Sequence, residues 1–509
     1  MCSAAGTGSP AVRHFKKGNK DMKISRFFAG LCSAALAASI LPVSAEESKT
    51  AFCEAVPDNV RILGRTVYND DSLWLANSVS GVEFTVTGTQ VTFNLNVSGD
   101  PTRIGVYLNG QLYQRGLIGV SSKKGSVTVP LAEGENTVRL IKLSESMQSE
   151  LGIDSIETDA GSTIKPTSAK ERKLEFIGDS ITCGYGIDLP LKDPSTGENN
   201  KFSTLSEDAS KTYAYQIASM FDSDVDLFSM SGCGVWCNYG GSRDHTMEKY
   251  YRKTSLNTWN SISSQDYVLI QDFDWDHSQY QPECIVIDLG TNDWTYFDSH
   301  ENEKEIFEDS YTDLLKLVRE CSPDAKIVCT LGMMGAELYP QIKNAVDEYK
   351  SDTGDKEVYT LKLGQIDPAQ EGYGVDYHPL AASNTRVAEN ELGPFIAGIM
   401  GWDLGPMPDD GTLTHTPDDL TVGEYHEQPA DNVSDQSESS DPESDVSESS
   451  TSSAVSSTSL ASSVSESTSS FRTTTNPNQS EDNPTTGMAG GMAMIALMGG
   501  AVIASKRKK

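Results

Sequence analysis

Residues 176–186 read FIGDSITCGYG, and this stretch decides the fold class of the chain. The apolar run from Leu174 to Ile177 predicts a short buried strand, and the small residues after it predict a tight turn. Ser180 lies at that turn, at the carboxyl end of the predicted strand. Open α/β sheets bind their ligands at this edge. We therefore expect an α/β sheet whose functional edge includes Ser180.

The sequence around this stretch alternates between strand and helix patterns, from about residue 173 to 402. Residues 284–289 form a near-continuous apolar run, which is typical of a strand buried on both faces. Further strands are predicted at 225–230, 326–331 and 358–363, and helices at 306–318, 338–349 and 381–400. This alternation predicts a mostly parallel sheet with helices on both faces.

The preceding part of the chain, residues 51–159, has a β pattern. Val82, Phe84 and Val86 alternate with polar residues, which is the period of half-buried strands. Asn109-Gly110 between two apolar runs predicts a hairpin turn. No long helical period interrupts this part, so we expect a small antiparallel β-sandwich in front of the α/β domain.

The two ends of the chain differ from its middle. Basic residues, an apolar run and Val43-Ser44-Ala45 have the order of a secretory signal peptide cleaved after Ala45. Residues 431–470 are almost entirely serine and acidic residues, and such a composition cannot bury a core. We therefore predict a signal peptide (1–45), a β-sandwich, jelly-roll-like (46–165), a hydrolase domain (166–404), a disordered linker (405–482) and a cell-wall sorting signal (483–509).

The last segment begins with Asn483-Pro484-Thr485-Thr486-Gly487, which is followed by an apolar run and a basic terminus. Such an ending predicts retention at a membrane. The five residues resemble a sortase signal in which Asn replaces the usual Leu, and this resemblance implies sortase and the cell wall of a Gram-positive bacterium as partners. We expect a secreted, surface-attached chain that is monomeric.

Composition excludes some classes of function. The formal net charge of −33 argues against nucleic acid as a partner, because phosphate binding requires basic patches. Seven scattered cysteines follow the predicted signal peptide, and their spacing predicts no disulfide framework. A single local disulfide between Cys233 and Cys237 is an alternative that the sequence does not decide. The spacing of this pair does not predict a zinc site, so we expect no metal and no cofactor.

Serine catalysis requires an activated hydroxyl, a base and donors for the oxyanion. Of the seven histidines, His378 follows the last predicted strand and precedes the last helix, which puts it at the same sheet edge as Ser180. Gly232 and Asn292 also follow predicted strands. A glycine turn lets a backbone N–H approach a substrate, and an asparagine amide can donate a hydrogen bond. Each of these two also suits an ordinary turn.

Four short segments together resemble the blocks of SGNH/GDSL hydrolases: Gly178-Asp179-Ser180, Ser231-Gly232, Gly290-Thr291-Asn292-Asp293 and His378-Pro379. The resemblance implies a flavodoxin-like three-layer α/β/α fold, with Ser180 as nucleophile and His378 as base. It also implies an oxyanion hole made of the Ser180 and Gly232 N–H groups and the Asn292 side chain.

The predicted β-sandwich in front of the hydrolase domain makes the resemblance more specific. With Gly64-Arg65 and Leu331-Gly332-Met333-Met334-Gly335, the chain resembles carbohydrate esterase family 2. That family implies removal of O-acetyl groups from xylan and glucomannan, without a metal. Many SGNH enzymes have an acid three residues before the histidine, where this chain has Val375. We expect either Asp376 or a backbone carbonyl to orient His378.

Three tryptophans near the blocks are candidate sugar-binding platforms: Trp236, Trp275 and Trp294. Core packing is the alternative for each of them. The leading hypothesis is therefore an acetyl esterase, acting on acetylated polysaccharide outside the cell. A lipolytic or peptidoglycan O-acetyl esterase of the same fold is a second reading, and a non-catalytic carbohydrate-binding surface protein is a third.

Overall fold

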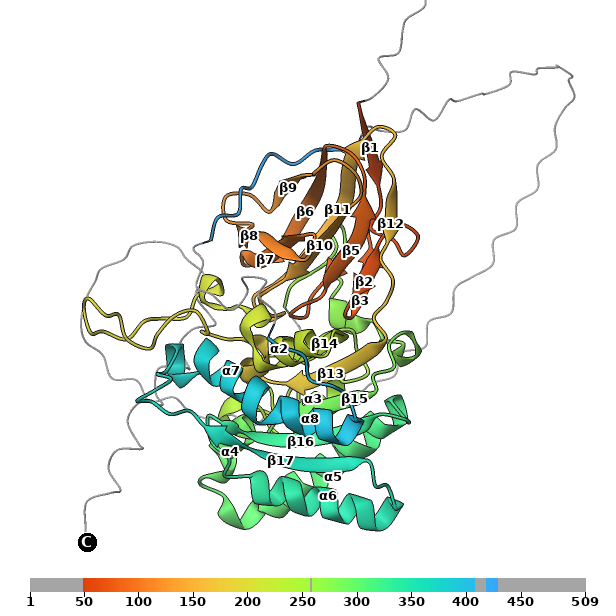
Figure 1. Cartoon of the computed structure of the whole chain (residues 1–509). Helices are drawn as coiled ribbons and strands as arrows, with labels where there is room; N and C mark the ends of the chain where they lie inside the picture. Colours follow the sequence, from red (N-terminus) through yellow and green to blue (C-terminus); the bar gives the residue numbers. More distant parts are fainter. Residues whose placement is uncertain (1–48, 257–258, 408–417, 429–509) are drawn as a thin grey trace, which may run out of the picture. The chain divides into compact units, whose positions relative to one another are not determined.

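Two kinds of sheet follow one another along the chain, as predicted: antiparallel sheets first and a parallel sheet afterwards (Figure 1). The computed structural model describes residues 49–256, 259–407 and 418–428. Within these ranges, no helix is long and apolar enough to cross a membrane. The predicted signal peptide and sorting signal lie outside the described residues.

The sandwich contains two six-stranded sheets within the described ranges. The first sheet consists of β1 (Thr50–Cys53), β3 (Thr66–Asn69), β4 (Ser72–Leu75), β6 (Gln90–Gly99), β9 (Lys124–Pro130) and β11 (Ser149–Asp159). The second consists of β2 (Arg61–Leu63), β5 (Gly81–Val86), β7 (Thr102–Leu108), β8 (Gln111–Ile118), β10 (Asn136–Lys142) and β12 (Ile164–Pro166). Val82, Phe84 and Val86 are fully buried between the sheets, which accounts for their period of two.

The predicted hairpin is present between β7 and β8. Asn109 and Gly110 form its turn, and both have positive φ angles, 53° and 82°. Asparagine and glycine adopt this left-handed conformation with the least steric cost, which is why the dipeptide marks hairpins.

The second domain has a five-stranded parallel sheet with the order β14-β13-β15-β16-β17. Its strands are β13 (Arg172–Gly178), β14 (Ser223–Ser229), β15 (Cys284–Asp288), β16 (Lys326–Met333) and β17 (Val358–Gln365). The order reverses beside β13, so that its carboxyl end is the switch point where such folds form their sites.

Helices cover both faces of this sheet (Figure 1). The helices are α1 (Ser180–Cys183), α2 (Tyr213–Met220), α3 (Met247–Tyr250), α4 (Thr291–Phe297), α5 (Lys304–Cys321), α6 (Tyr339–Thr353), α7 (Ala381–Asn390) and α8 (Leu392–Met400). Helices α5 and α6 pack on one face with Ile177 and Ile287, and α2, α7 and α8 pack on the other with Phe176 and Val286. This three-layer arrangement confirms the predicted fold class.

The single helix predicted over 381–400 is two helices. The chain breaks at Glu391, whose φ and ψ are −125° and −80°. Pro394 lies in the first turn of α8, where it needs no donor, whereas a continuous helix would require its missing N–H. The predicted helical pattern is present on both sides of the break, and Pro394 favours a new helix start in place of a continuous helix.

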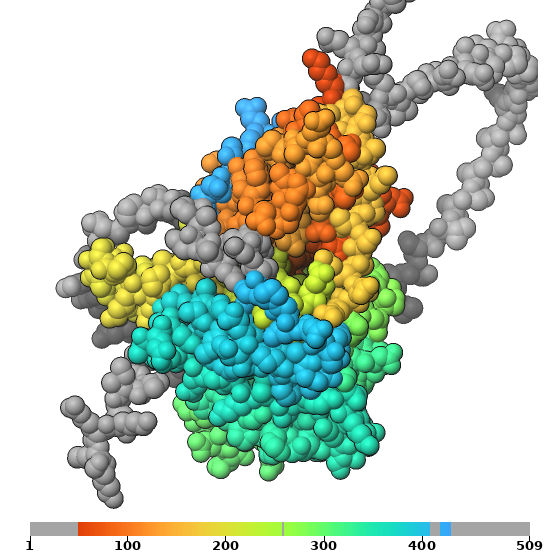
Figure 2. Space-filling view, in the orientation of Figure 1, coloured from red at the N-terminus to blue at the C-terminus, as the bar shows by residue number. Residues whose placement is uncertain are grey.

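The structure describes two parts of the predicted linker, residues 405–407 and 418–428. Residues 418–428 lie on the sandwich, where Gly423 bridges to Ser126 and Leu420 packs against the core (Figure 2). His426 is within 2.6 Å of the Glu157 carboxylate. The prediction that the whole of 405–482 is disordered is therefore wrong for this part, because a few well-placed residues pair with a sheet even where the composition is polar.

The sandwich and the parallel sheet share a buried ion cluster at Arg65. Its guanidinium is fully buried and donates to Glu175 of β13 at 2.6 Å and to Asp226 of β14 at 3.1 Å. It also donates to the carbonyl oxygens of Tyr251 and Lys253. One side chain of the sandwich therefore satisfies two buried carboxylates of the second domain.

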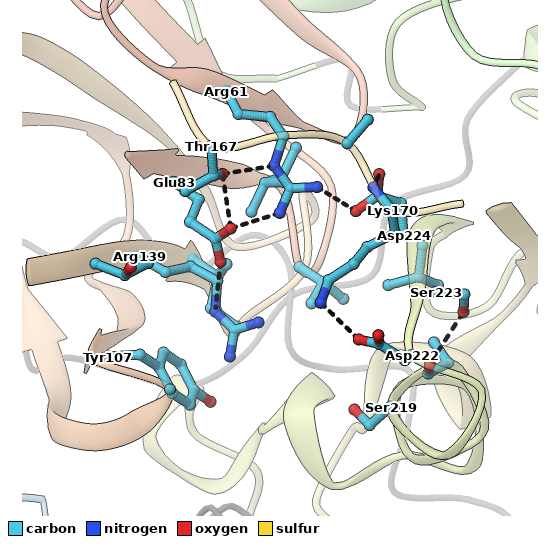
Figure 3. A pocket seen from close by; sticks show the side chains of 18 of the residues that line it. Arg61, Glu83, Tyr107, Arg139, Thr167, Lys170, Ser219, Asp222, Ser223 and Asp224 are labelled. Atoms are coloured by element: carbon cyan, nitrogen blue, oxygen red, sulfur yellow. Dashed lines mark hydrogen bonds and ion pairs between the residues drawn. The ribbon is translucent and has the colours of Figure 1, made fainter. Parts of the chain in front are cut away.

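A second bridge lies nearer the surface (Figure 3). Arg61 binds Glu83 at 2.6 Å and Asp224 at 2.5 Å, while Lys170 binds Asp222 at the more exposed rim of the same polar groove. The apolar core is also continuous here, because Leu143 and Ile141 of the sandwich pack with residues of the parallel sheet. The two domains therefore behave as one packed unit.

We expect Arg65→Met to lower the free energy of unfolding by about 3–5 kcal/mol, because it leaves two buried carboxylates without their cation. Urea denaturation followed by circular dichroism measures the loss. Lys170→Met is the matched control: its ion pair is 42% and 82% exposed, so its removal should cost less than about 1 kcal/mol. A similar small loss for both variants would contradict the structural role of Arg65.

Candidate active site

Ser180 begins helix α1 directly after β13. Asp179 caps the helix and accepts a hydrogen bond from the Ile181 N–H at 3.0 Å. A side chain at Gly178 would lie 2.1 Å from the Thr182 hydroxyl, so this position accepts only glycine and the turn stays tight. Ser180 is 8% exposed at the carboxyl edge of the sheet.

The structure places His378 next to Ser180, although 198 residues separate them. The Nε2 atom of His378 lies 2.8 Å from the Ser180 Oγ atom. This distance suits proton transfer from a nucleophilic hydroxyl to a general base. His378 reaches this position because it follows the short 3-10 turn η7 (Val375–Tyr377) and precedes α7.

The other nitrogen of the imidazole faces a backbone carbonyl. Nδ1 of His378 lies 3.2 Å from the Val375 oxygen, and a donor at Nδ1 leaves Nε2 free to accept a proton. The Asp376 carboxylate points elsewhere and accepts a hydrogen bond from the Tyr185 hydroxyl at 3.0 Å. Of the two orienting groups expected from the sequence, the Val375 carbonyl is the one that contacts Nδ1 in the structure, and the Asp376 carboxylate contacts Tyr185 instead.

The backbone explains why Asp376 turns away. Asp376 and Tyr377 both have positive φ angles, 52° and 65°, inside η7. This sharp turn folds His378 back onto the carbonyl three residues earlier and directs the intervening carboxylate toward Tyr185. Sequence spacing alone does not reveal such a turn.

Tyr185 forms a wall of the site that sequence reasoning missed. Its ring stacks on Phe202 with centroids 3.9 Å apart and lies 4.5 Å from the His378 ring. Burial, and then the nearby Asp376 carboxylate, raise the pKa of Tyr185, so the phenol stays neutral and keeps donating. Its position five residues after Ser180 was the available signal.

The glycine and asparagine blocks also lie at this edge. Gly232 has a φ angle of 77° in the loop after β14, a conformation that glycine adopts without strain. The Asn292 amide nitrogen donates to the Asp179 carboxylate at 3.0 Å and to the Cys233 carbonyl at 2.9 Å. Asn292 therefore ties the loops after β13, β14 and β15 together. Both of its amide hydrogens have acceptors, so an oxyanion would have to share one of them.

Asp293 anchors the same loop from α4. Its buried carboxylate accepts hydrogen bonds from the N–H groups of Val235, Trp236 and Cys237 at 2.8–3.0 Å. Burial raises the pKa of Asp293 to about 6, while these three donors oppose the shift. Cys233 and Cys237 are free thiols, so the local disulfide that the sequence left open is not formed.

The environment of the site disfavours charge on its titratable groups. Burial lowers the pKa of His378 to about 4, although its backbone hydrogen bonds act in the opposite direction. Burial also raises the pKa of Asp179 well above its usual range, and the neighbouring Asp288 adds to this effect. At neutral pH the imidazole is therefore an uncharged base, ready to accept a proton.

The three candidate platforms lie in different places. Trp236 packs half-buried against Tyr296, with ring centroids 4.9 Å apart, in the loop that Asp293 anchors. Trp294 is a half-buried residue of α4, two positions after Asn292, with the Lys304 ammonium 4.8 Å from its ring centroid. Both rings therefore belong to elements that carry site residues.

Trp275 is placed differently. Its ring lies 5.8 Å from the Arg65 guanidinium. That guanidinium binds Glu175, which lies in the middle of β13 and not at the carboxyl end of the strand. Trp275 therefore lies near the Arg65 cluster, and its assignment as a sugar platform stays a prediction. Tyr239 is a better-placed aromatic residue, because its N–H donates to the Gly232 carbonyl and the Asp376 charge, after burial, raises its pKa.

Known families match both domains. Residues 174–391 match the model for GDSL-like lipase/acylhydrolases, and residues 62–167 match the carbohydrate esterase 2 N-terminal model. The cellulase/esterase CelE of Acetivibrio thermocellus is 29% identical over 68% of this chain, which spans only 40% of that relative's length. An acetylxylan esterase / glucomannan deacetylase of Cellvibrio japonicus is 25% identical over 70% of this chain and 93% of that protein.

Solved structures agree with these matches. A family two carbohydrate esterase from Clostridium thermocellum, in complex with cellohexaose, is 28% identical with a TM-score of 0.57, covering 68% of this chain and all of that one. An acetyl xylan esterase from the rumen bacterium Butyrivibrio proteoclasticus shares the fold at 24% identity, with a TM-score of 0.61 over 70% of this chain and 100% of that chain. The chain therefore combines a carbohydrate esterase 2 N-terminal domain with a GDSL-like lipase/acylhydrolase domain, and its relatives are family 2 carbohydrate esterases.

Proposed function

We propose that the chain is a serine esterase that removes O-acetyl groups from plant-type polysaccharides such as xylan and glucomannan. The observation that carries this proposal is the 2.8 Å distance between Ser180 Oγ and His378 Nε2, at the switch point of a GDSL-type sheet. The substrate class rests on the curated relative described as an acetylxylan esterase / glucomannan deacetylase. A pure sugar-binding protein would need no such pair.

The proposed reaction proceeds through an acyl-enzyme. Ser180 attacks the acetyl carbonyl while His378 takes its proton, and the N–H groups of Ser180 and Gly232 face the oxyanion that forms. The imidazolium then protonates the departing sugar oxygen, which leaves as a hydroxyl, and a water molecule activated by His378 hydrolyses the acetyl-serine and releases acetate. The Val375 carbonyl keeps the proton on Nδ1 throughout, which fixes the reactive tautomer.

Aromatic side chains on the neighbouring loops suit the sugar part of the substrate. Trp236, Tyr239 and Trp294 belong to the loop after β14 or to α4, beside the oxyanion groups. Aromatic faces are the usual platforms for pyranose rings, so we assign the polysaccharide to this side of Ser180. The chain needs no metal for these steps.

We further propose that the enzyme acts outside the cell, attached to the wall of a Gram-positive bacterium. The support is the sequence alone: the signal-peptide pattern ending at Ala45 and the sortase-like residues 483–487 before an apolar run. Recovery of the chain only after enzymatic digestion of the wall would agree with this placement, and recovery from the cytosol would contradict it.

The function is tested by acetate release from acetylated xylan and acetylated glucomannan, with 4-nitrophenyl acetate as a control ester. We expect the wild type to act on all three and Ser180→Ala to lose at least about 1,000-fold in kcat, because the nucleophile is gone. Full activity of the variant would disprove the nucleophile. Turnover of the aryl ester without acetate from either polysaccharide would disprove the substrate class.

The pH dependence follows from the low pKa of His378. The reaction requires the neutral imidazole, so kcat/KM should stay constant from pH 7 down to about pH 5 and fall about tenfold per unit below about pH 4. A pH-rate profile with 4-nitrophenyl acetate measures this, with activity regained at pH 7 as the control for unfolding. A midpoint near the ordinary value of about 6.5 would contradict it.

Asp376→Asn distinguishes a carbonyl partner from a carboxylate partner. In a Ser-His-Asp triad the equivalent change lowers kcat by about 10,000-fold, because the tautomer is lost. Here the Val375 carbonyl holds Nδ1, so we expect a loss of less than about tenfold in steady-state kcat. His378→Ala is the matched control and should lose nearly all activity; an equally severe loss in Asp376→Asn would restore Asp376 as the orienting acid.

A further inference from the structure

The sandwich domain sends one acidic side chain to the catalytic edge of the sheet. Glu145 follows β10 and is completely buried, and its Oε2 atom accepts a hydrogen bond from the Ser231 N–H at 2.6 Å. The same oxygen lies 3.6 Å from the Cys183 thiol of α1. A residue outside the hydrolase domain therefore contacts the helix that begins with Ser180 and the loop that carries Gly232.

We propose that Glu145 is a positioning residue that holds the loop after β14, which carries Ser231 and Gly232 and is called the oxyanion loop below. The sandwich domain is then part of the catalytic unit. The proposal rests on the proposed esterase function. Ser231 directly precedes Gly232, whose N–H is the proposed oxyanion donor. Fixing the Ser231 amide restricts the orientation of the next peptide group, and an oxyanion hole depends on donors that are oriented before the reaction.

Glu145 completes a set of three anchors on this loop. Asn292 holds the Cys233 carbonyl, and Asp293 holds the three N–H groups of residues 235–237. Those two anchors come from α4 and bind residues that follow Gly232 in the chain. Glu145 binds Ser231, which precedes Gly232. Its removal would leave the amino-terminal side of the loop without a side-chain hydrogen bond of this kind.

A buried cation lies beside this carboxyl group: burial raises the pKa of Glu145, and the charge of Lys142 opposes this shift. The ammonium of Lys142 is fully buried and donates to the carbonyl oxygens of Ser144 and Glu145 at 2.6 Å and 2.8 Å. Glu145, Cys183 and Glu207 together have the spacing of a metal-binding group. The ammonium next to them supplies positive charge from the protein itself, so the same residues favour a structural role over a metal site.

An anchor of the oxyanion loop should act on the transition state more than on bound substrate, because the donors matter most when charge develops. Its loss should therefore lower kcat and leave KM nearly unchanged. A residue that only stabilised the fold would change neither parameter while the protein stays folded. Comparing the change in kcat with the change in KM therefore distinguishes a positioning role from a purely structural role.

The test compares Glu145→Gln and Glu145→Leu in the full chain, with 4-nitrophenyl acetate as substrate. Glutamine keeps the length and an acceptor oxygen, so we expect a kcat loss of about threefold to tenfold; leucine keeps neither and should lose more than about tenfold. KM should stay within about twofold in both. Glu83→Gln is the matched control: it alters another carboxylate of the domain junction, which binds Arg61 at 2.6 Å, and should lower the melting temperature without lowering kcat.

Several outcomes would overturn the proposal. An unchanged kcat in Glu145→Gln would do so even if Glu145→Leu failed to fold, and so would a rise in KM that accounts for the whole loss. Loss of wild-type activity on chelation, with recovery on adding Zn²⁺, would assign the cluster to a metal instead. Absence of turnover in the wild type would reject the esterase function itself, which is a separate result.

Discussion

The buried guanidinium of Arg65 fixes the sandwich against the parallel sheet that carries the site. A charge this deep in a protein is tolerated only when it is fully paired, and here Glu175 and Asp226 provide the pairing from adjacent parallel strands. Because the partners lie on β13 and β14, the contact orients the strands whose carboxyl ends carry Ser180 and Gly232. The sandwich is thereby docked in one geometry, and Glu145 can reach the Ser231 amide.

Buried carboxylates recur around the site for a related reason. Asp293 and Glu145 accept backbone N–H groups of the loop after β14. Asp179 accepts the Ile181 N–H of α1 and the side-chain amide of Asn292. Loops that contain glycine have many conformations, and backbone N–H groups bound to a fixed oxygen lose most of that freedom. This arrangement places several acidic side chains where water solvates them poorly. Burial therefore raises the pKa of Asp179 and Asp293.

The sequence predicted what depends on chain order and missed what depends on turns and long-range contacts. Ser180, Gly232, Asn292 and His378 each follow a strand, and parallel strands bring their carboxyl ends together, so their meeting was predictable. The orientation of Asp376 was not, because it depends on two positive φ angles in η7.

Long-range partners were similarly invisible. Glu145 lies 86 residues before Ser231 in a different domain, and nothing in its local pattern marks it. Trp275 illustrates the same limit: its acidic, loop-like surroundings predict a sugar platform, and the structure places its ring near Arg65. Local composition indicates whether a residue is exposed. The edge of the sheet at which a loop lies depends on the folded chain.

A base held by a carbonyl has a specific consequence for the proposed chemistry. A carboxylate on Nδ1 would stabilise the imidazolium and raise its pKa, whereas the Val375 carbonyl offers a dipole and no charge. The imidazolium formed during acyl transfer is then less stable and a stronger acid, which favours rapid delivery of the proton to the departing sugar oxygen. The same arrangement makes His378 a weaker base toward Ser180. The oxyanion donors must therefore supply more of the stabilisation in the first step, and the anchors of the loop that carries Gly232 gain importance accordingly.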